Sequence, residues 1–341
     1  MKGNCNMAQP SHPIRIALAG AGIFAQNAHL PALRTLAERC EIVAVYSRTH
    51  AAAAALAQQI GGDVAVFTDY AALLARPDIT AVDILLPIPV QADYVEAALL
   101  AGKHVVSEKP IAPDHATAQR LLARCAARPD QVWMVAENWR YEEAFEHAAR
   151  LIADGAIGRP INAHWSRFTA LRPGNRYYAT TWRRSGFAGG LLLDGVIHLA
   201  AALRLVLGEV VSVVSMVDQV APDLPPADTM TAILRCGSGA ICSLQVSYAV
   251  DTPWGTPLTI VGTEGSLRVD RGFVEIAHLG AEVVRSEWGK LHGVQRELAA
   301  FIDAIQHSAP HRNSPTEALR DLAVVEAMLA AATQPGITVS L

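Results

Sequence analysis

Residues 14–25 read IRIALAGAGIFA, an apolar run that passes directly into a glycine-rich turn. The second half, Gly20 to Ala25, matches G-x-G-x-x-A, the turn between the first strand and the first helix of a dinucleotide-binding domain. Its small residues let the backbone approach a pyrophosphate, and the N-terminus of the following helix offers N–H groups to it. A tight turn without a nucleotide could also read this way, so the pattern of the following residues has to support the interpretation.

After this turn, β-rich runs alternate with helical stretches, which is the pattern of a parallel sheet covered by helices. The expected strands are residues 14–19, 42–46, 64–67, 81–86, 104–107 and 132–136. The expected helices are residues 26–36, 51–59, 70–75, 91–101 and 116–125. The alternation predicts a Rossmann dinucleotide-binding domain over residues 12–138.

The pattern changes after residue 138, where helices become fewer and strands follow one another. A helix over 142–154, a strand over 161–169 and a helix over 189–207 precede this strand-rich part, and helices over 294–306 and 315–332 and a strand over 337–341 follow it. The successive strands are residues 210–220, 229–235, 240–250, 258–261, 266–269 and 273–278. Strands without crossover helices pair antiparallel. We therefore predict an α/β protein whose residues 139–341 form an α+β domain for substrate binding and oligomerisation, with a large, mostly antiparallel, open-faced sheet.

The composition is typical of a packed globular enzyme. The chain has 341 residues, of which 51% are hydrophobic and 18% charged, and its net charge of −4 gives no overall attraction for nucleic acid. Its most apolar helical stretch, residues 190–207, is interrupted by Asp194, His198 and Arg204, so no membrane span is predicted. Residues 1–11 are polar and lack the apolar core of a secretory signal, which favours a cytoplasmic protein.

The five cysteines, at positions 5, 40, 125, 236 and 242, form no CxxC pair and no Cys/His metal spacing. We expect reduced thiols and no metal site. A small molecule is therefore the expected partner.

The end of the second strand bears on the choice of cofactor. An acidic residue there would bind the ribose 2′-hydroxyl of NAD, but the sequence continues from Tyr46 with Ser47 and Arg48. A hydroxyl followed by a guanidinium suits the 2′-phosphate of NADP, because arginine can hold its oxygens bidentately. We therefore expect NADP(H) rather than NAD(H), although Arg48 could also be a solvated charge at the start of a helix.

Two further elements carry chemistry. Glu108-Lys109-Pro110 closes the fifth strand at the carboxyl edge of the sheet, where open α/β folds bind ligands, and a lysine there can hold or relay a hydroxyl proton. Asp194 and His198 stand four residues apart on an apolar helix, so both lie on one face and need a partner or a cavity. Taken alone, this pair could be a core histidine satisfied by its own aspartate. Together with Lys109 it predicts a catalytic group.

With these residues, the chain resembles the family of glucose–fructose oxidoreductase, inositol dehydrogenase and rhizopine-catabolism proteins (Gfo/Idh/MocA). The resemblance extends from Ile14 to the C-terminal helices. The matching residues are Gly20 and Gly22, Glu108-Lys109-Pro110, Asn138 with Arg140, Ile157-Gly158, Trp182-Arg183, and the run Gly189-Gly190 with Asp194 and His198. The resemblance implies hydride transfer between nicotinamide and the hydroxyl or carbonyl carbon of a small sugar-like, polyol, aldehyde or ketone substrate.

The resemblance also implies roles for individual residues. It makes Lys109, Asp194 and His198 catalytic, with Lys109 or His198 exchanging the substrate hydroxyl proton. Cofactor contacts are expected from Gly20, Gly22, Ile23, Phe24, Ala25, Ser47, Arg48, Pro87, Glu108, Lys109, Asn138, Trp182 and Arg183. Substrate contacts are expected from Lys109, Arg140, Tyr177, Asp194 and His198. The chain departs from the family pattern at Ala188, Val196, Ala201 and Leu86-Pro87-Ile88, which favours a drier substrate pocket than that of polyol-specific members.

Other interpretations stay open. The family also permits a non-catalytic dinucleotide-binding sensor, or a redox-neutral NAD-dependent hydrolase or lyase that borrows and returns a hydride. The arginines and aromatic residues between 167 and 184 could bind single-stranded nucleic acid, but the acidic chain disfavours it. A hydrolytic triad of Ser185, His198 and Asp194 lacks a nucleophile elbow.

We expect a homodimer or homotetramer formed through the sheet of the second domain, because an uncovered sheet face would leave an apolar patch in water.

Overall fold

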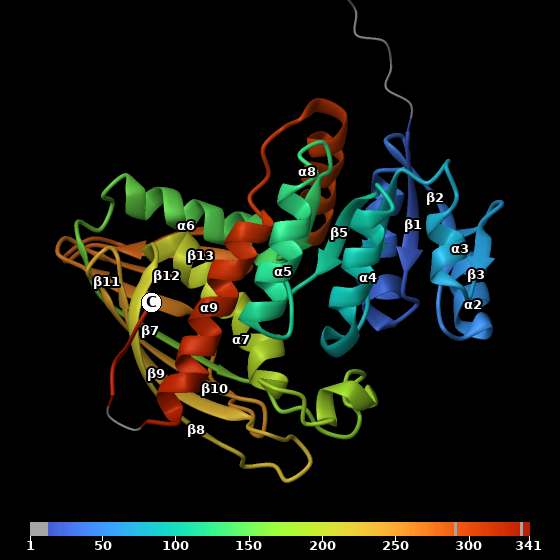
Figure 1. The fold of residues 1–341 in the computed structure, drawn as a ribbon. Helices are drawn as coiled ribbons and strands as arrows, with labels where there is room; N and C mark the ends of the chain where they lie inside the picture. The colour runs from blue at the N-terminus through green and yellow to red at the C-terminus, as the bar shows by residue number, and fades with distance from the viewer. Residues whose placement is uncertain (1–12, 290–291, 335–336) are drawn as a thin grey trace, which may run out of the picture.

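The computed structural model describes residues 13–289, 292–334 and 337–341, which form two sheets with helices (Figure 1). The expectations for residues 1–12, including the polar N-terminal tail and Cys5, lie outside the described residues.

The first sheet is parallel, with strand order β3-β2-β1-β4-β5-β6. Its strands are β1 (Ile14–Ala19), β2 (Cys40–Tyr46), β3 (Ala65–Phe67), β4 (Ala81–Ile84), β5 (His104–Glu108) and β6 (Trp133–Ala136). The helical segments between them are η1 (Ala25–His29), α1 (Leu30–Thr35), α2 (His50–Ile60), α3 (Tyr70–Leu74), α4 (Ile88–Leu100) and α5 (His115–Ala126). This order confirms the predicted Rossmann fold, and the glycine turn leads into a π-helical turn, η1.

Burial on both faces explains why the strands of this sheet are mostly apolar. In β1, Ile16 and Leu18 belong to one buried cluster, while Ala17 and Ala19 belong to the other. Successive side chains of a strand point to opposite faces, so a central parallel strand needs apolar residues at every position. The prediction of a strand over residues 14–19 is thus confirmed as the central strand β1.

The glycine turn at the carboxyl end of β1 depends on two different properties of glycine. Gly20 has a φ of +123°, and a Cβ there would fall on the carbonyl oxygen of Leu85. At Gly22, by contrast, no described atom lies within 4 Å of the position of a Cβ. The turn is therefore packed tightly against the loop after β4 at Gly20 and open at Gly22.

The second sheet has the strand order β14-β13-β12-β11-β7-β10-β9-β8-β15. Its strands are β7 (Pro160–Phe168), β8 (Val210–Asp218), β9 (Thr229–Cys236), β10 (Ile241–Ser247), β11 (Leu258–Gly262), β12 (Ser266–Asp270), β13 (Phe273–Ala277), β14 (Val284–Glu287) and β15 (Val339–Ser340). The sheet is mostly antiparallel, as predicted, but β7 and β10 pair in parallel and β14 has no counterpart among the predicted strands. The chain leaves β7 through helix α7 (Gly190–Leu207), so β7 can join a later strand in the same direction.

Helices cover one face of this sheet. They are α6 (Glu143–Ala153), α7 and α9 (Pro315–Ala332), which lie together in Figure 1. In β9, Met230, Ala232 and Leu234 point to these helices and are buried, whereas Thr231 and Ile233 are on the exposed side. The exposed residues that alternate along β8 and β9 leave the other face of these strands open, which matches the predicted open-faced architecture.

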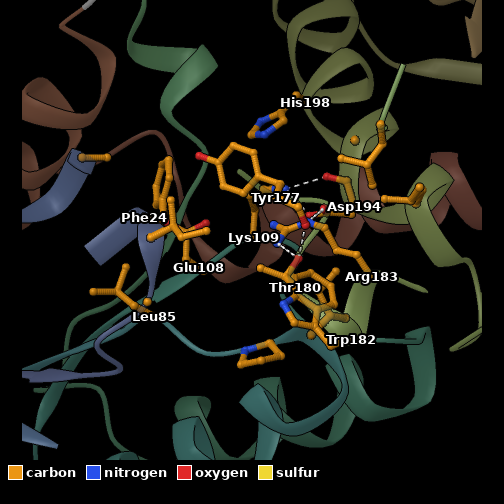
Figure 2. A pocket seen from close by; sticks show the side chains of 18 of the residues that line it. Phe24, Leu85, Glu108, Lys109, Tyr177, Thr180, Trp182, Arg183, Asp194 and His198 are labelled. Carbon is orange, nitrogen blue, oxygen red and sulfur yellow. Dashed lines mark hydrogen bonds and ion pairs between the residues drawn. The ribbon is translucent and has the colours of Figure 1, made fainter. Parts of the chain in front are cut away.

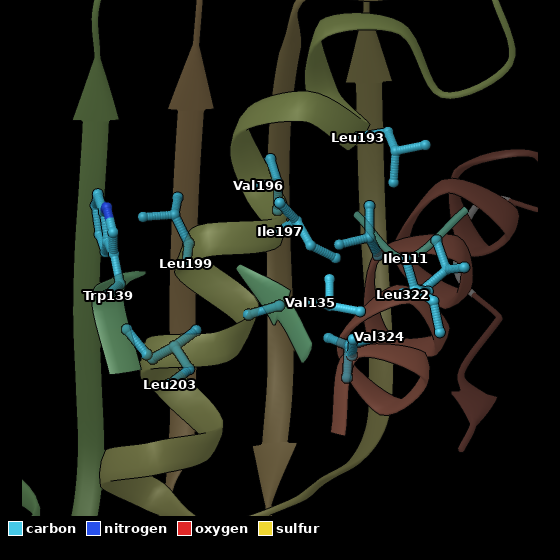
Figure 3. Packing of buried hydrophobic residues seen from close by; sticks show 14 of the residues in the cluster. Ile111, Val135, Trp139, Leu193, Val196, Ile197, Leu199, Leu203, Leu322 and Val324 are labelled. Carbon is cyan, nitrogen blue, oxygen red and sulfur yellow. The ribbon is translucent and has the colours of Figure 1, made fainter. Parts of the chain in front are cut away.

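Helix α7 occupies the centre of the molecule. Figure 3 shows its side chains Leu193, Val196 and Leu199 in one cluster with Val135 of β6 and Leu322 of α9. The helix is long and apolar enough to cross a bilayer, but most of it is buried inside the protein. Its apolarity is thus that of a core helix.

Two 3₁₀ turns and helix α8 remain among the described elements. A 3₁₀ turn, η2 (Asn138–Tyr141), connects β6 to α6, and a second one, η3 (Thr181–Arg184), precedes α7. Helix α8 (Gly293–His307) lies in the second part of the sequence, but its Leu298, Phe301 and Ile302 belong to the same cluster as Ile16 and Leu18 of β1. Packing therefore does not divide cleanly at residue 138, because α8 covers one face of the first sheet.

Candidate active site

A cavity of about 520 Å³ lies between the carboxyl edge of the first sheet and the helices of the second domain. It is lined by the glycine turn, the loops after β4 and β5, the turn η2, the segment around η3 and helix α7 (Figure 2). Of the residues predicted from the sequence, those that line it are Gly22, Ile23, Phe24, Ala25, Pro87, Glu108, Lys109, Asn138, Tyr177, Trp182, Arg183, Asp194 and His198. The three residues proposed as catalytic thus face one cavity together with the glycine turn.

Lys109 and Asp194 form the charged centre of this cavity. Lys109 Nζ lies 2.7 Å from Asp194 Oδ1 and 2.5 Å from the Asp194 backbone oxygen. Arg183 Nε donates to the other carboxylate oxygen, Oδ2, at 2.8 Å. Burial alone would raise the pKa of Asp194, but the two cations outweigh it and hold that pKa well below its ordinary value. Asp194 is therefore an ionised anchor for Lys109 and Arg183, with both of its carboxylate oxygens occupied.

His198 also faces the cavity, but its partner is not Asp194. His198 Nδ1 lies 2.7 Å from Glu137 Oε1, and Glu137 is almost fully buried just after β6. The imidazole also stacks on Trp139, with ring centroids 5.3 Å apart and an interplanar angle of 14°. The alternative of a core histidine satisfied by its own aspartate is therefore wrong.

A second histidine lies behind the glycine turn. His29 is fully buried, and its ring nitrogens lie 2.7 Å from Asp83 Oδ2 and 3.1 Å from Glu108 Oε1. Burial would lower the pKa of His29, but the two carboxylates outweigh it and raise the pKa well above its ordinary value. Glu108, which lines the cavity, is thus anchored by a buried cation on η1.

The irregular segment before α7 forms one wall of the cavity. Arg183 lies between two rings, with its Cζ atom 4.1 Å from the centroid of Trp182 and 5.0 Å from that of Tyr177. Its Nη1 also donates to Thr180 Oγ1 at 3.0 Å. Arg183 is predicted to contact the cofactor. In the structure it binds Asp194 and holds the side chains of this wall together (Figure 2).

Four predicted residues lie outside the cavity lining, namely Gly20, Ser47, Arg48 and Arg140. Ser47 and Arg48 follow β2, where Ser47 is half-buried and Arg48 is exposed at the start of α2. Arg140 is a correction to the predicted substrate contacts, because its side chain is buried against Asp321 of α9 and not directed into the cavity. A buried guanidinium must be paired, and this pairing uses the group that substrate binding would need.

Four residues at the site were not predicted from the sequence. Trp139, Tyr248 and Arg271 line the cavity, whereas Glu137 is buried outside the lining and contacts His198. A Cβ at Gly195, in the run beside Asp194, would collide with the Tyr248 hydroxyl group. The position of Glu137 immediately after a sheet strand, at the carboxyl edge, is the signal that could have identified it.

The described part of the chain contains no group of three or more His, Cys, Asp or Glu side chains placed to hold a metal ion.

Comparisons with known proteins agree with this geometry. Residues 14–136 match the oxidoreductase family with an NAD-binding Rossmann fold, and residues 145–268 match the GFO/IDH/MocA C-terminal domain. A dehydrogenase of Fusarium mangiferae, FPY6, is 34% identical, with 95% of this chain and 97% of the relative aligned. The dTDP-3,4-didehydro-2,6-dideoxy-α-D-glucose 3-reductase of Streptomyces violaceoruber is 30% identical over 79% of this chain and 76% of its own length.

The same relationship holds in three dimensions. The crystal structure of an oxidoreductase from Thermotoga maritima superposes with a TM-score of 0.89 at 32% identity, covering 96% of this chain and 98% of that one. The chain belongs to the GFO/IDH/MocA family of oxidoreductases, enzymes with an NAD-binding Rossmann fold.

Proposed function

We propose that the protein is an NADP(H)-dependent oxidoreductase that interconverts a hydroxyl and a carbonyl group on a small sugar-like, polyol, aldehyde or ketone substrate. The observation that carries this proposal is the convergence of Lys109 and His198 on one cavity that also contains the glycine turn. A relative named for reducing the 3-position of a dTDP-linked sugar supports a carbohydrate-like substrate.

The residues at the glycine turn fit a dinucleotide. We propose that a phosphate occupies the open space at Gly22, where the helical turn that begins directly after it would offer its first N–H groups. Phe24 of this turn and Pro87 of the loop after β4 also line the cavity. When bound, the nicotinamide ring supplies or accepts the hydride.

Lys109 and His198 then divide the chemistry at the substrate oxygen. Two N–H donors of Lys109 are directed at Asp194, which leaves the third for the substrate oxygen and places a positive charge where negative charge develops. His198 exchanges the hydroxyl proton, because its ring lines the same cavity. Asp194 fixes the position of the Lys109 ammonium group.

The preference for NADP rests on the residues after β2. Neither Ser47 nor Arg48 is acidic, and Thr49, the residue before α2, forms no side-chain bond to the helix N-terminus. We propose that the N–H groups of His50 and Ala51, which precede the N–H groups that donate to Thr49 O, bind an anion together with the Arg48 guanidinium. A ribose 2′-phosphate is the anion that this position would receive.

Replacing Arg48 by alanine is expected to weaken NADPH binding by about tenfold or more and to leave NADH binding unchanged, because only NADPH carries the phosphate. Arg34, an exposed arginine that donates to a backbone oxygen, provides the matched control, and Arg34→Ala should change neither affinity. The measurement is titration with each cofactor, followed by nicotinamide fluorescence. Equal losses for the two cofactors would refute the 2′-phosphate site.

A substrate screen tests the activity itself. Purified protein with NADPH and a panel of ketosugars, aldehydes and ketones, or with NADP⁺ and the corresponding alcohols, should show a net change in nicotinamide absorbance with at least one substrate. Product formation without any net absorbance change would instead support the redox-neutral hydrolase or lyase. Cofactor binding without product in any arm would support the sensor.

We also propose that the open face of the second sheet joins copies of this chain into a homodimer or homotetramer. Met216 of β8, Ile233 of β9 and Val261 of β11 lie on this face with exposed fractions of 67%, 45% and 47%. Apolar side chains exposed on a broad sheet are typical of an interface.

Replacing Ile233 by aspartate should shift the sedimentation coefficient toward that of a monomer, because the charge would be buried between copies. Leu100 of α4 is similarly exposed but lies on the first domain, so Leu100→Asp is the control and should leave the assembly intact. A wild-type chain that sediments as a monomer would contradict this proposal.

We propose a cytoplasmic location, because free cysteines are typical of that reducing compartment. Cys236 and Cys242 lie buried on the adjacent strands β9 and β10 and are both free, and burial raises the pKa of Cys236 to about 11 and that of Cys242 to about 12. Cell fractionation tests this assignment, and recovery of the protein outside the cytosolic fraction would contradict it.

A further inference from the structure

The three residues that follow β6, Glu137-Asn138-Trp139, build the surroundings of His198. The Glu137 oxygen that contacts His198 Nδ1 also accepts the backbone N–H of Trp139 at 3.1 Å. The Trp139 indole is itself held on its stack by Phe145, whose ring centroid lies 5.6 Å away at an angle of 14°. The imidazole is therefore fixed both at one nitrogen and across one face.

The ionisation of Glu137 determines which ring nitrogen of His198 carries the proton. Burial would raise the pKa of Glu137, but the charges of His198, Arg140 and Lys109 outweigh it, so the pKa lies below its ordinary value. An ionised carboxylate can only accept hydrogen bonds, so the contact requires a proton on Nδ1. In the neutral ring Nε2 is then unprotonated and able to accept a proton.

The comparison with His29 shows why this matters. Both ring nitrogens of His29 are bonded to carboxylates, so that ring has no nitrogen left for a substrate. Among the described residues that line the cavity, His198 is the one histidine. Glu137 forms a hydrogen bond with one of its two ring nitrogens, Nδ1. One nitrogen, Nε2, remains for chemistry.

We propose that Glu137 is a positioning residue that selects the Nδ1–H tautomer of His198 and, together with Trp139, presents Nε2 to the substrate hydroxyl group. The inference rests on the proposed hydride-transfer function and deepens it. In the oxidation direction, the substrate O–H proton moves to Nε2, the C–H hydride leaves to the oxidised nicotinamide, and the C–O bond becomes a carbonyl. The imidazolium formed keeps its Nδ1–H bond to Glu137, which stabilises the added charge. Reduction reverses each transfer.

The tautomer can be measured without a substrate. Long-range ¹H–¹⁵N spectra of the full-length protein, labelled at histidine and saturated with NADP⁺, distinguish the two nitrogens, and His198→Asn identifies the signal. We expect the Nδ1–H pattern in the wild type and a shift toward Nε2–H in Glu137→Gln, because a neutral amide can donate to Nδ1 as well as accept from it. A wild-type Nε2–H pattern would overturn the proposal even if no variant folds.

Kinetics provide the second measurement. With a substrate from the screen, Glu137→Gln should lower kcat about 10²–10⁴-fold and change KM by less than about threefold, because the lost interaction matters when the proton moves. NADPH affinity should be unchanged. The matched control is Glu146→Gln, which removes another buried carboxylate that pairs with Arg296 and Arg312 instead of His198.

The control variant should retain the tautomer and kcat per folded molecule. An unchanged tautomer and unchanged kcat in Glu137→Gln would overturn the positioning role. An absence of turnover with every substrate would contradict the proposed function, and the spectra would still decide the role of Glu137.

Discussion

Replacing Lys109 by methionine should lower kcat by about 10³-fold or more and leave NADPH affinity nearly unchanged. Methionine keeps the length and apolar stem of the side chain but removes the ammonium group that lies 2.7 Å from Asp194 Oδ1 and offers its remaining N–H to the substrate oxygen. Asp194 would still be held by Arg183, so the cavity should keep its shape. Steady-state kinetics with a substrate from the screen, together with cofactor titration, measure the two effects.

Lys103 offers a matched control for this experiment. It is also buried, but its ammonium group donates to the backbone oxygens of Arg76 and Ile79 in the first domain, away from the cavity. Lys103→Met should reduce stability and leave kcat per folded molecule within about threefold. If Lys109→Met keeps a comparable turnover, Lys109 has no catalytic role.

Replacing Asp321 by asparagine should lower the free energy of unfolding by about 3–5 kcal/mol, because the buried Arg140 loses the carboxylate that it pairs with and Arg204 keeps only Glu209 and Glu317. Arg140 Nη2 lies 2.5 and 2.6 Å from the two carboxylate oxygens of Asp321, and Arg204 Nη1 lies 2.5 Å from one of them. Burial raises the pKa of Asp321, and the two arginines oppose that effect. Urea-induced unfolding followed by tryptophan fluorescence gives the change.

The control for Asp321 is an exposed ion pair of similar geometry. Asp303 accepts from Arg39 Nη2 at 2.6 Å, but both side chains are at least one-third exposed. Because solvent screens such a pair, Asp303→Asn should cost less than about 1 kcal/mol. Equal losses for the two variants would show that the Arg140–Asp321–Arg204 cluster is not a buried structural element.

The elements that could be predicted are those whose signals are local. Helix α9 was predicted with its observed ends, because Ser314 caps it by accepting the N–H of Glu317 and a proline opens its first turn. The strands of the first sheet were recognisable because burial on both faces requires continuous apolar runs. The shared location of Lys109, Asp194 and His198 at one cavity could be predicted because a strand end and a helical i,i+4 spacing fix where such side chains point.

The features that could not be predicted depend on contacts between distant positions. Arg140 and Asp321 are 181 residues apart, and His198 and Glu137 are 61 residues apart, so no spacing reveals either pair. The sequence therefore suggests a substrate contact for Arg140, which lies near the predicted site. It gives no indication that Glu137 contacts His198. The parallel pairing of β7 with β10 was missed for the same reason, since α7 and two strands intervene in the sequence.

Titration of the wild-type protein with NADPH and with NADH, followed by nicotinamide fluorescence, tests the proposed NADP(H)-dependent chemistry most directly. We expect saturable binding of both cofactors, with NADPH tighter by about tenfold or more because of the proposed 2′-phosphate site at Ser47 and Arg48. NADH binding as tightly as NADPH would contradict the cofactor assignment, and no binding of either would contradict the proposed chemistry as a whole.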